Sequence, residues 1–356
     1  MKTPVEPVRA GTPEAAEWLG LVQRVYPDRR FRGGQGRHEV PLLAGTHPLS
    51  AGLDFNPLLV RDREGRGIGR CAVTFRTDSP VAYLGLLEFT DPAAAPALFA
   101  AAETLAAERG CRAIRGPFEP DYWVGYRLKL DHFDVPPFFG EPFNRPEYPA
   151  AWEAAGYAAA ERYRSTVLFS PQVPAEGPFS RSTLERRLDS AGVELRPLGR
   201  QFADLLPLVH QLVMDRFAVM SEFHPLEFDQ FEALMRPLGQ VLDRQASQVA
   251  WAGDQLVGFA AAMPDFGRSL DSGTARAAAL LAGRLRPRAL IGAYLAVDDA
   301  YRGLGPALTL PGLERAARLG VPGIGALMHH AAPTASYLPD QVSRTHNYAI
   351  FHKTLS

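Results

Sequence analysis

The chain has 356 residues, and its 38 Lys and Arg residues nearly balance its 39 Asp and Glu residues, so the formal net charge is −1. Hydrophobic residues make up 46% and charged residues 22% of the sequence, which excludes wholesale disorder. A protein that neutralises nucleic-acid phosphates normally carries a basic excess, so the charge argues against that class. The length predicts two domains rather than one.

The first residues, the apolar runs and the two cysteines indicate where the protein is expected to be located. Residues 1–7 contain no apolar segment of the secretory type, and no run of 18 or more uninterrupted apolar residues occurs. Cys71 and Cys111 lie far apart, without the spacing of a metal site or a disulfide framework. We therefore expect a cytoplasmic protein that does not span a membrane.

The first half of the sequence alternates predicted strands with predicted helices. Two β-rich runs around the polar turn 63–66 predict a hairpin, and the apolar spacing before Gly110 predicts a helix that ends there. The predicted strands are 56–62, 67–75, 81–89, 112–116 and 162–169, and the predicted helices are 92–109 and 149–155.

The second half repeats this order, which predicts two copies of one α/β domain, each with a mixed sheet and helices on both faces. Three prolines between Ser170 and Pro178 indicate a linker. The predicted strands are 193–196, 247–252, 255–263, 289–297, 323–329 and 348–353, and the predicted helices are 202–219, 228–242 and 306–319. The predicted domains are 1–170 and 191–356, with 171–190 as the linker.

The segment after strand 289–297 contains the clearest motif. A glycine-containing turn follows the strand, and a helix starts at Pro306, which suits a first helical turn. The N–H groups of a first turn have no partner within the helix, and the helix dipole adds positive potential, so this arrangement predicts an anion site. The alternative is a strand-to-helix turn that binds nothing, and the turn alone does not exclude it.

This segment resembles the acetyl-coenzyme A (acetyl-CoA) pyrophosphate loop of the GNAT (GCN5-related N-acetyltransferase) superfamily. The family pattern is Val-x-Pro-x-x-Arg-Gly-x-Gly-x-Gly/Ala, placed after the fourth strand. Asp299 stands where proline is usual, and Pro306 removes one possible amide donor. The matching positions are Val297, Arg302, Gly303, Gly305 and Ala307.

The resemblance implies two tandem GNAT-like acyl-CoA N-acyltransferase domains. The order of elements matches over the second half and, less specifically, over the first. The first copy has neither an arginine nor a glycine turn after strand 81–89, so the resemblance implies that it is degenerate and that the second copy binds acetyl-CoA as the acyl donor. The implied donor-binding residues are Leu295, Ala296, Val297, Arg302, Gly303, Leu304, Gly305, Pro306, Ala307 and Leu308.

Tyr337 is the catalytic residue that the resemblance implies. The family often has Asn-x-x-Ala-x-x-x-Tyr after its fifth strand, and the same spacing here gives His330, Pro333 and Tyr337, so only the tyrosine is in register. A phenol with an ordinary pKa of about 10 can protonate a leaving thiolate. The alternative is that Tyr337 only packs against the sheet.

The general base is not identified by the sequence. Candidate groups lie at the end of the fifth strand, in the predicted anion turn and in the loop after helix 202–219, and a chain of water molecules would serve equally well. These groups are His329, His330, Asp298, Asp299, Glu222 and His224. No spacing of histidines or cysteines predicts a metal site.

The sequence therefore predicts an acetyl-CoA-dependent N-acetyltransferase that acts on a small-molecule or peptide amine. It predicts neither a nucleic-acid nor a membrane partner, and it leaves a homo-oligomer possible. Two other classes remain open. One is a non-catalytic coenzyme A-binding or scaffold protein, and the other is an aminoacyl-tRNA-dependent transferase.

Overall fold

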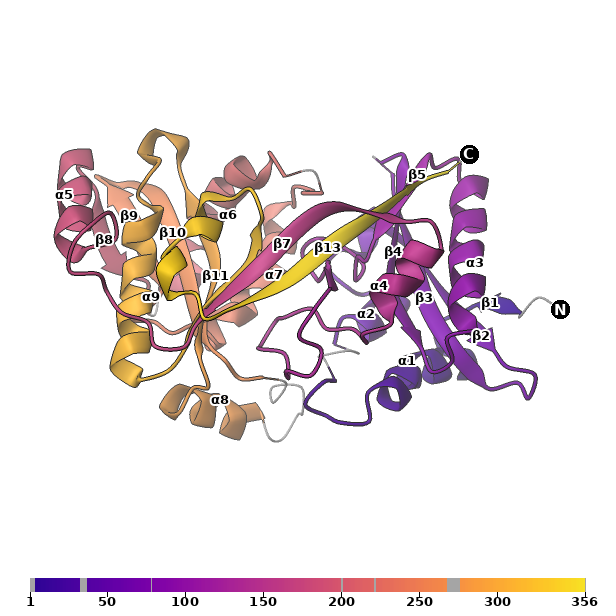
Figure 1. Ribbon diagram of the computed structural model, residues 1–356. Coiled ribbons are helices and arrows are strands. Elements are labelled where there is room, and N and C mark those ends of the chain that lie inside the picture. The colour runs from indigo at the N-terminus through magenta and orange to yellow at the C-terminus, as the bar shows by residue number, and fades with distance from the viewer. Residues whose placement is uncertain are drawn as a thin grey trace. The chain divides into compact units, whose positions relative to one another are not determined.

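The computed structural model describes residues 4–32, 37–77, 79–199, 201–220, 222–267 and 276–355. The chain forms two compact units (Figure 1). Unit 1 comprises Met1–Arg162 with Asn347–Ser356, and unit 2 comprises Tyr163–His346. Both are mixed α/β units, which confirms the predicted fold class.

In unit 1 the strand order is β1-β2-β3-β4-β5-β13, and β6 pairs with β13. The β4–β5 pair is parallel, and the other pairs in the unit are antiparallel. The strands are β1 (Val5–Pro7), β2 (Leu53–Arg61), β3 (Gly67–Arg76), β4 (Val81–Phe89), β5 (Ala113–Gly116), β6 (Leu128–Lys129) and β13 (Arg344–Thr354).

Helices cover both faces of the unit 1 sheet. Successive strand residues point to opposite faces, so Leu58 and Val60 pack with α3 while Leu59 packs with α1. Trp18 of α1 is fully buried, and its indole N–H donates to the backbone of β2 and β3. The helices are α1 (Pro13–Val25), α2 (Glu39–Leu43), η1 (Ser50–Gly52), α3 (Ala94–Glu108) and α4 (Tyr148–Ala154).

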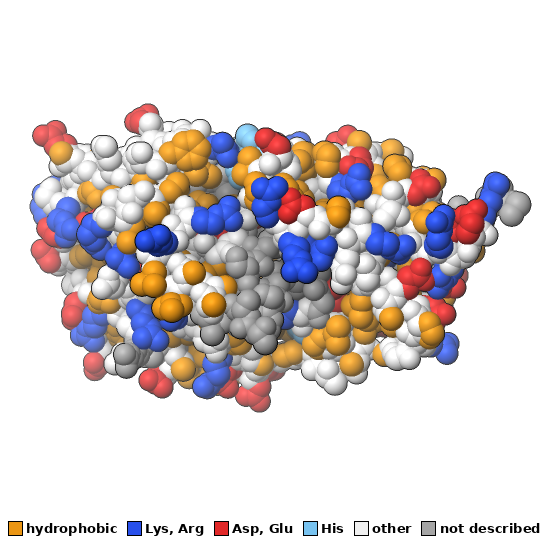
Figure 2. Space-filling model, turned by 90° about the horizontal axis from the view of Figure 1, so that it is seen from below, with side chains coloured by type: hydrophobic (Ala, Val, Ile, Leu, Met, Phe, Trp, Pro, Cys, Tyr) orange, Lys and Arg blue, Asp and Glu red, His pale blue; other side chains and the backbone are white. Residues whose placement is uncertain are grey.

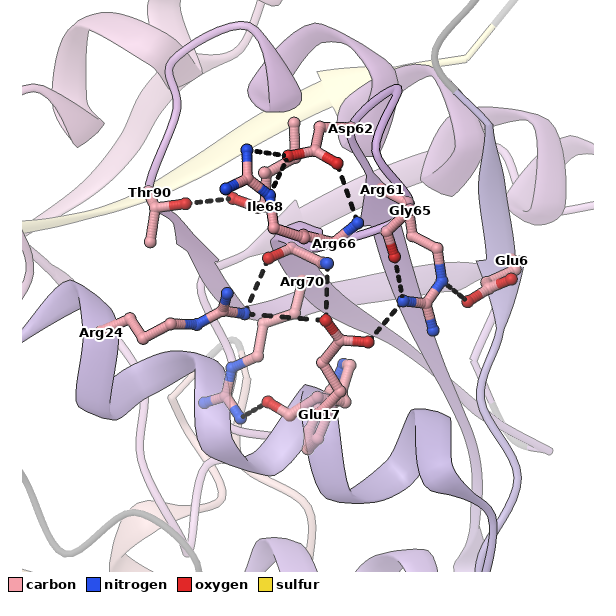
Figure 3. Close-up of polar contacts among 12 residues, drawn as sticks. Glu6, Glu17, Arg24, Arg61, Asp62, Gly65, Arg66, Ile68, Arg70 and Thr90 are labelled. Atoms are coloured by element: carbon pink, nitrogen blue, oxygen red, sulfur yellow. Dashed lines mark hydrogen bonds and ion pairs between the residues drawn. The ribbon is translucent and has the colours of Figure 1, made fainter.

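A network of polar contacts joins α1 to the β2–β3 hairpin (Figure 3). Glu17 accepts a hydrogen bond from the Gly67 N–H at 2.6 Å and pairs with Arg61, which also pairs with Glu6 of β1. Arg24 donates to the Gly67 carbonyl at 2.7 Å. Because these side chains are partly exposed, each pair adds at most about 1 kcal/mol. The network therefore orients α1, and burial of Trp18 contributes more to its stability.

Unit 2 has the same strand order, β8-β9-β10-β11-β12-β7. Among the described strands of this unit, β11 and β12 pair in parallel and the other pairs are antiparallel. The strands are β7 (Ala158–Leu168), β8 (Glu194–Pro197), β9 (Gln248–Ala252), β10 (Gln255–Pro264), β11 (Leu290–Val297) and β12 (Gly323–His329).

The helices of unit 2 also lie on both faces of their sheet. Ala260 of β10 packs with Leu304 and Leu308 at the start of α9, whereas the adjacent Phe259 stacks on Phe202 of α6. The helices are α5 (Arg181–Ala191), α6 (Phe202–Phe217), α7 (Phe228–Met235), η2 (Arg236–Gln240), α8 (Arg276–Leu285), η4 (Asp299–Tyr301), α9 (Gly305–Leu319), η5 (Pro333–Ser336) and η6 (Pro339–Gln341).

The last strand of each sheet comes from the other half of the sequence. β7 begins in unit 1 and pairs with β12 of unit 2, with Leu168 opposite Gly323. β13 begins in unit 2 and pairs with β5 of unit 1, with Phe351 opposite Gly116. The two units therefore have the same strand order, and each sheet is completed by a strand that starts in the other unit.

Several helices differ from the sequence-based expectation. The helix predicted over 228–242 ends at Met235, because Pro237 follows and the chain continues as the 3-10 helix η2. Helix α5 lies in the stretch predicted as a linker, and only Leu184 of this strongly polar helix is buried. Helices α1, α2 and α8 were not predicted either.

Surface chemistry agrees with the balanced composition. On the face drawn in Figure 2, basic side chains are separated by acidic and hydrophobic ones. In the described parts of the chain, no helix combines the length and the apolarity that a membrane crossing requires.

Candidate functional site

The parallel strands of unit 2 separate before β11 ends. β11 pairs with β12 only over Leu290–Gly292, whereas β10 follows β11 as far as Val297. Beyond Gly292, the backbone groups of Leu295 and Val297 have no β12 partner among the described residues. An opening therefore lies at the carboxyl end of the parallel pair, the end at which open α/β sheets bind ligands.

A β-bulge directs the backbone of β11 into this opening. The pairing with β10 shifts register at Ala293. Leu290 donates its N–H toward β12, but Asp298, an even number of residues later, donates its N–H toward β10. Alternate residues of a regular strand point to the same edge, so the bulge has reversed the direction. Leu295 and Val297 consequently point their backbone groups toward the opening.

The turn from β11 into α9 depends on glycine. Gly303 has φ of +94°, a conformation that residues with a Cβ rarely adopt. The Asp298 carboxylate accepts a hydrogen bond from the Ala300 N–H at 2.9 Å and caps the short helix η4. Arg302 and Gly303 are exposed, whereas residues 304–308 are buried. The turn therefore presents its tip to solvent and anchors the helix start in the core.

The first turn of α9 has unpaired amides. The N–H groups of Gly303, Gly305 and Ala307 have no acceptor among the described residues. These three donors and the dipole of a 15-residue helix create positive potential at one point. A Cβ at Gly305 would collide with the Tyr337 hydroxyl, so a larger residue there would have to displace that side chain. The residues present thus fit a phosphate-bearing ligand.

Two arginines lie at the tip of this turn. The Asp299 carboxylate binds Arg302 through Nε at 3.0 Å and also pairs with Arg216 of α6. Both guanidinium groups lower the pKa of Asp299, the larger part coming from Arg216. Arg302 is 81% exposed and is held only through Nε in this pair, so its two Nη groups can contact an incoming anion.

The structure brings Tyr337 to the start of α9. Its hydroxyl contacts Gly305, next to the Leu295 side chain, and its ring packs edge-on against Phe179 with centroids 5.1 Å apart. Burial raises the pKa of Tyr337 to about 12, and the positive charge of Arg187 partly opposes that shift. The phenol therefore stays protonated at neutral pH.

The candidate bases are less well placed. The Nδ1 atom of His329 accepts from the Ala331 N–H at 3.2 Å, and its ring packs edge-on against Tyr163. This ring nitrogen orders the loop and is not available as a base. His330 is exposed, and Glu222 is buried. Burial and exposure alone do not identify one of these groups as the base, and a water chain can also accept the amine proton.

Three residues near this site were missed by sequence reasoning. Phe179 and Arg187 lie within the stretch predicted as a linker, and Arg216 is at the end of a helix where a basic residue is common. Their proximity depends on packing of α5 and α6, which the local pattern does not encode. In the described residues, no group of three or more His, Cys, Asp or Glu side chains is arranged to hold a metal ion.

The corresponding opening in unit 1 is filled by the chain itself. β4 and β5 pair only from Val81 to Tyr83 on the β4 side. The Phe118 N–H then donates to the Leu84 carbonyl at 3.0 Å, and a Cβ at Gly85 would collide with the Phe118 backbone. Segment 117–127 thus donates one backbone hydrogen bond to β4 beyond the paired residues and packs against Gly85.

In unit 1, backbone N–H groups before α3 and at the end of β4 also have hydrogen-bond acceptors within the protein. The Asp91 carboxylate accepts from the Ala93 N–H at 2.9 Å before α3 begins. The Tyr148 hydroxyl donates to the Glu88 carboxylate at 2.7 Å and accepts from the Phe89 N–H at 3.0 Å. Burial raises the pKa of Glu88 to about 7, although nearby Arg70 acts in the opposite direction.

Comparison with solved structures agrees with this geometry. The chain has the tandem fold of GCN5-related N-acetyltransferases over nearly its whole length. A tandem GNAT protein from the clavulanic acid biosynthesis pathway has a TM-score of 0.55 and 15% identity, with 99% of this chain and 98% of that chain covered. A GCN5-related N-acetyltransferase from Sphaerobacter thermophilus has a TM-score of 0.52 and 13% identity, with 99% and 97% covered.

A third similar structure is the GCN5-related glucosamine N-acetyltransferase region of a fungal multi-domain β-N-acetylglucosaminidase, with a TM-score of 0.58 and 12% identity. It covers 99% of this chain and 38% of the fungal chain. The sequence itself matches no protein-family model and no curated protein. At these identities the likeness shows the fold, and function has to be argued from the site.

Proposed function

We propose that unit 2 binds an acyl-CoA, with acetyl-CoA as the expected donor, and that the protein transfers the acyl group to an amine. The observation that carries this proposal is two sets of backbone groups without a partner among the described residues. One set lies on β11, at Leu295 and Val297, and the other is the N–H groups of Gly303, Gly305 and Ala307 at the start of α9. A pantetheine thioester with a diphosphate tail has hydrogen-bonding groups in that order.

In this proposal the two sets of backbone groups have separate tasks. The free backbone groups of Leu295 and Val297 pair with the amides of the pantetheine arm, as the addition of a strand would. The amides of the α9 first turn and the Nη groups of Arg302 hold the diphosphate. Residues 304–308 contribute backbone and apolar packing, so their side chains are expected to matter less than their conformation.

The chemical step requires a balanced movement of protons. The amine nitrogen attacks the thioester carbonyl carbon, the C–N bond forms and the C–S bond breaks. The amine proton leaves to water or a base, and the leaving thiolate takes a proton. Tyr337 is the sequence-based candidate for that proton donor, and its raised pKa keeps the phenol protonated, but its contacts do not distinguish this role from hydrogen bonding to another part of the donor. Holding the thioester at the open edge supplies the orientation for attack.

Calorimetry with acetyl-CoA tests the proposal. We expect one binding site per chain, because the opening of unit 1 is filled. Gly305→Val should abolish binding, because the new side chain collides with the Tyr337 hydroxyl. Gly312→Val is the matched control: Gly312 lies in the same helix with open space at its Cβ position, so this variant should still bind. Two sites, or none, would contradict the proposal.

Release of free thiol with a panel of amines tests the transfer step. We expect thiol release that depends on both acetyl-CoA and one class of amine. Binding of acetyl-CoA without thiol release for any amine in the panel would instead identify a coenzyme A-binding protein. The Gly305→Val variant should release no thiol, which excludes background hydrolysis by the protein surface.

A further inference from the structure

The Tyr337 hydroxyl is an unpaired donor at an anion site. It contacts the first residue of α9, and no hydrogen bond connects it to any described residue. The neighbouring N–H groups of Gly303 and Gly305 are unpaired as well. Several unpaired donors at one point require an acceptor, and an anionic oxygen satisfies more than one of them at once.

The ring that carries this hydroxyl is held in place on several sides. Phe179 packs against it edge-on, and the Tyr337 N–H donates to the Thr334 carbonyl at 3.2 Å. Arg164 donates to the Ala335 carbonyl at 2.6 Å and so fixes the short helix η5 that precedes Tyr337. A donor held this way loses little entropy when it binds a ligand.

We propose that the Tyr337 hydroxyl donates a hydrogen bond to the diphosphate of the acyl donor and so serves as a phosphate-binding residue at the start of α9. This inference rests on the proposed function, because it assumes that unit 2 binds an acyl-CoA. It differs from the acid role, in which the same hydroxyl acts on the leaving sulfur.

The local electrostatics favour an anion at this position. Arg187 of α5 has no ion pair among the described residues, and its charge acts on the Tyr337 phenol. The ion pair between Arg181 and Glu314 joins α5 to α9. At neutral pH the phenol is protonated, so it donates to a phosphate oxygen without repelling it.

The decisive experiment compares two donors in wild type and Tyr337→Phe. Acetyl-CoA carries the diphosphate, and S-acetylpantetheine lacks it. For acetyl-CoA we expect the dissociation constant to rise about tenfold in the variant, the range for a hydrogen bond to a charged group. For S-acetylpantetheine we expect no change. Phenylalanine keeps the ring packing against Phe179, so the fold should be retained.

Tyr301→Phe is the matched control, because Tyr301 ends the short helix η4 before α9 and packs against the core of unit 2 without a hydrogen bond from its hydroxyl to any described residue. It should leave the affinity for both donors unchanged. In turnover, the phosphate role predicts a raised KM for acetyl-CoA with kcat nearly unchanged in Tyr337→Phe.

Three results would overturn the inference. Unchanged acetyl-CoA affinity with a large fall in kcat would assign Tyr337 to the acid role. An equal loss of affinity for both donors would show that the hydroxyl only maintains the structure. Failure of the wild-type protein to bind acetyl-CoA would overturn the proposed function as well, and this outcome is distinguishable because it does not depend on any variant.

Discussion

The two units have the same strand order, yet the openings between their parallel strands differ. In unit 1, β4 and β5 pair over three residues on each strand and then separate, and so do β11 and β12 in unit 2. Beyond that point the Phe118 N–H donates to the Leu84 carbonyl in unit 1, whereas Leu295 and Val297 of β11 in unit 2 have no such partner among the described residues.

This difference shows how one fold supports either packing or binding. A polar backbone edge that is buried has to be hydrogen-bonded, either by the protein or by a ligand. In unit 1 the Phe118 N–H bonds the Leu84 carbonyl, and the Phe118 backbone lies against Gly85. In unit 2 the chain after β12 turns away into η5, which leaves the edge free and puts Tyr337 at the start of α9.

The largest expected effect is a loss of stability when a methyl group is added at Gly85 of β4 in unit 1. In Gly85→Ala the new Cβ collides with the Phe118 backbone, which cannot move without breaking the segment that fills unit 1. We expect the free energy of unfolding, measured by urea denaturation, to fall by about 3 kcal/mol or more.

Gly292→Ala, at the last residue of β11 that pairs with β12, is the comparison in unit 2. Its Cβ would lie 3.7 Å from the Ile324 carbonyl oxygen, an ordinary contact, so the free energy of unfolding should change by less than about 1 kcal/mol. If the two variants lost equal stability, the opening of unit 1 would not be filled more tightly than that of unit 2, and the comparison would fail.

The second prediction concerns the buried carboxyl of unit 1. Glu88 has a pKa of about 7 in the folded state and an ordinary value of 4.5, so the folded protein binds its proton more tightly than the unfolded chain. Its contribution to stability is therefore complete below pH 4.5 and is lost as the pH rises through 7. A shift of this size corresponds to about 3 kcal/mol.

The Glu88→Gln variant should abolish this dependence, because an amide does not ionise. We expect the variant to be more stable than wild type at pH 9 and nearly equal to it at pH 5, as measured by urea denaturation at both values. Glu64→Gln, a change at a side chain that is 67% exposed, is the control and should follow wild type. A Glu88→Gln variant that is less stable than wild type at pH 9 would contradict the raised pKa.

Much of this comparison could be predicted from local sequence patterns. The alternation of strands and helices gave the mixed α/β class, and the glycine turn between β11 and α9 lies where the motif places it. The absence of such a turn after β4 indicated that the two copies differ. These features depend on short segments, in which residue type and spacing determine conformation directly.

Other features depend on contacts between distant segments and could not be predicted. The residue pattern of β13 does not indicate which sheet the strand completes, because the backbone groups along a strand edge can pair with any other strand. Segment 117–127 contains no signal that it fills an opening. The contact of Tyr337 with Gly305 requires the path of the whole chain between β12 and β13. Helix α5 was missed because it buries only Leu184.

The smallest expected effect is a change in acetyl-CoA affinity on substitution of an exposed arginine, and it should differ between the two units. Arg302 is 81% exposed at the turn before α9, and Arg66 is 70% exposed in the β2–β3 hairpin of unit 1. Arg302→Ala should weaken acetyl-CoA binding about fivefold at low salt, because one charge-assisted contact to the diphosphate is lost. The loss should shrink to about twofold in 0.5 M salt, where the Debye length is only a few ångströms.

Arg66→Ala should change acetyl-CoA binding at neither salt concentration, because Arg66 pairs with Asp62 in a unit whose own opening is filled. Calorimetric titrations of the two variants at both salt concentrations would decide the matter. A loss that is equal for both arginines would reflect a general change in surface charge. A loss for Arg302 alone that does not respond to salt would mean that Arg302 shapes the turn through Asp299 and does not contact the phosphates.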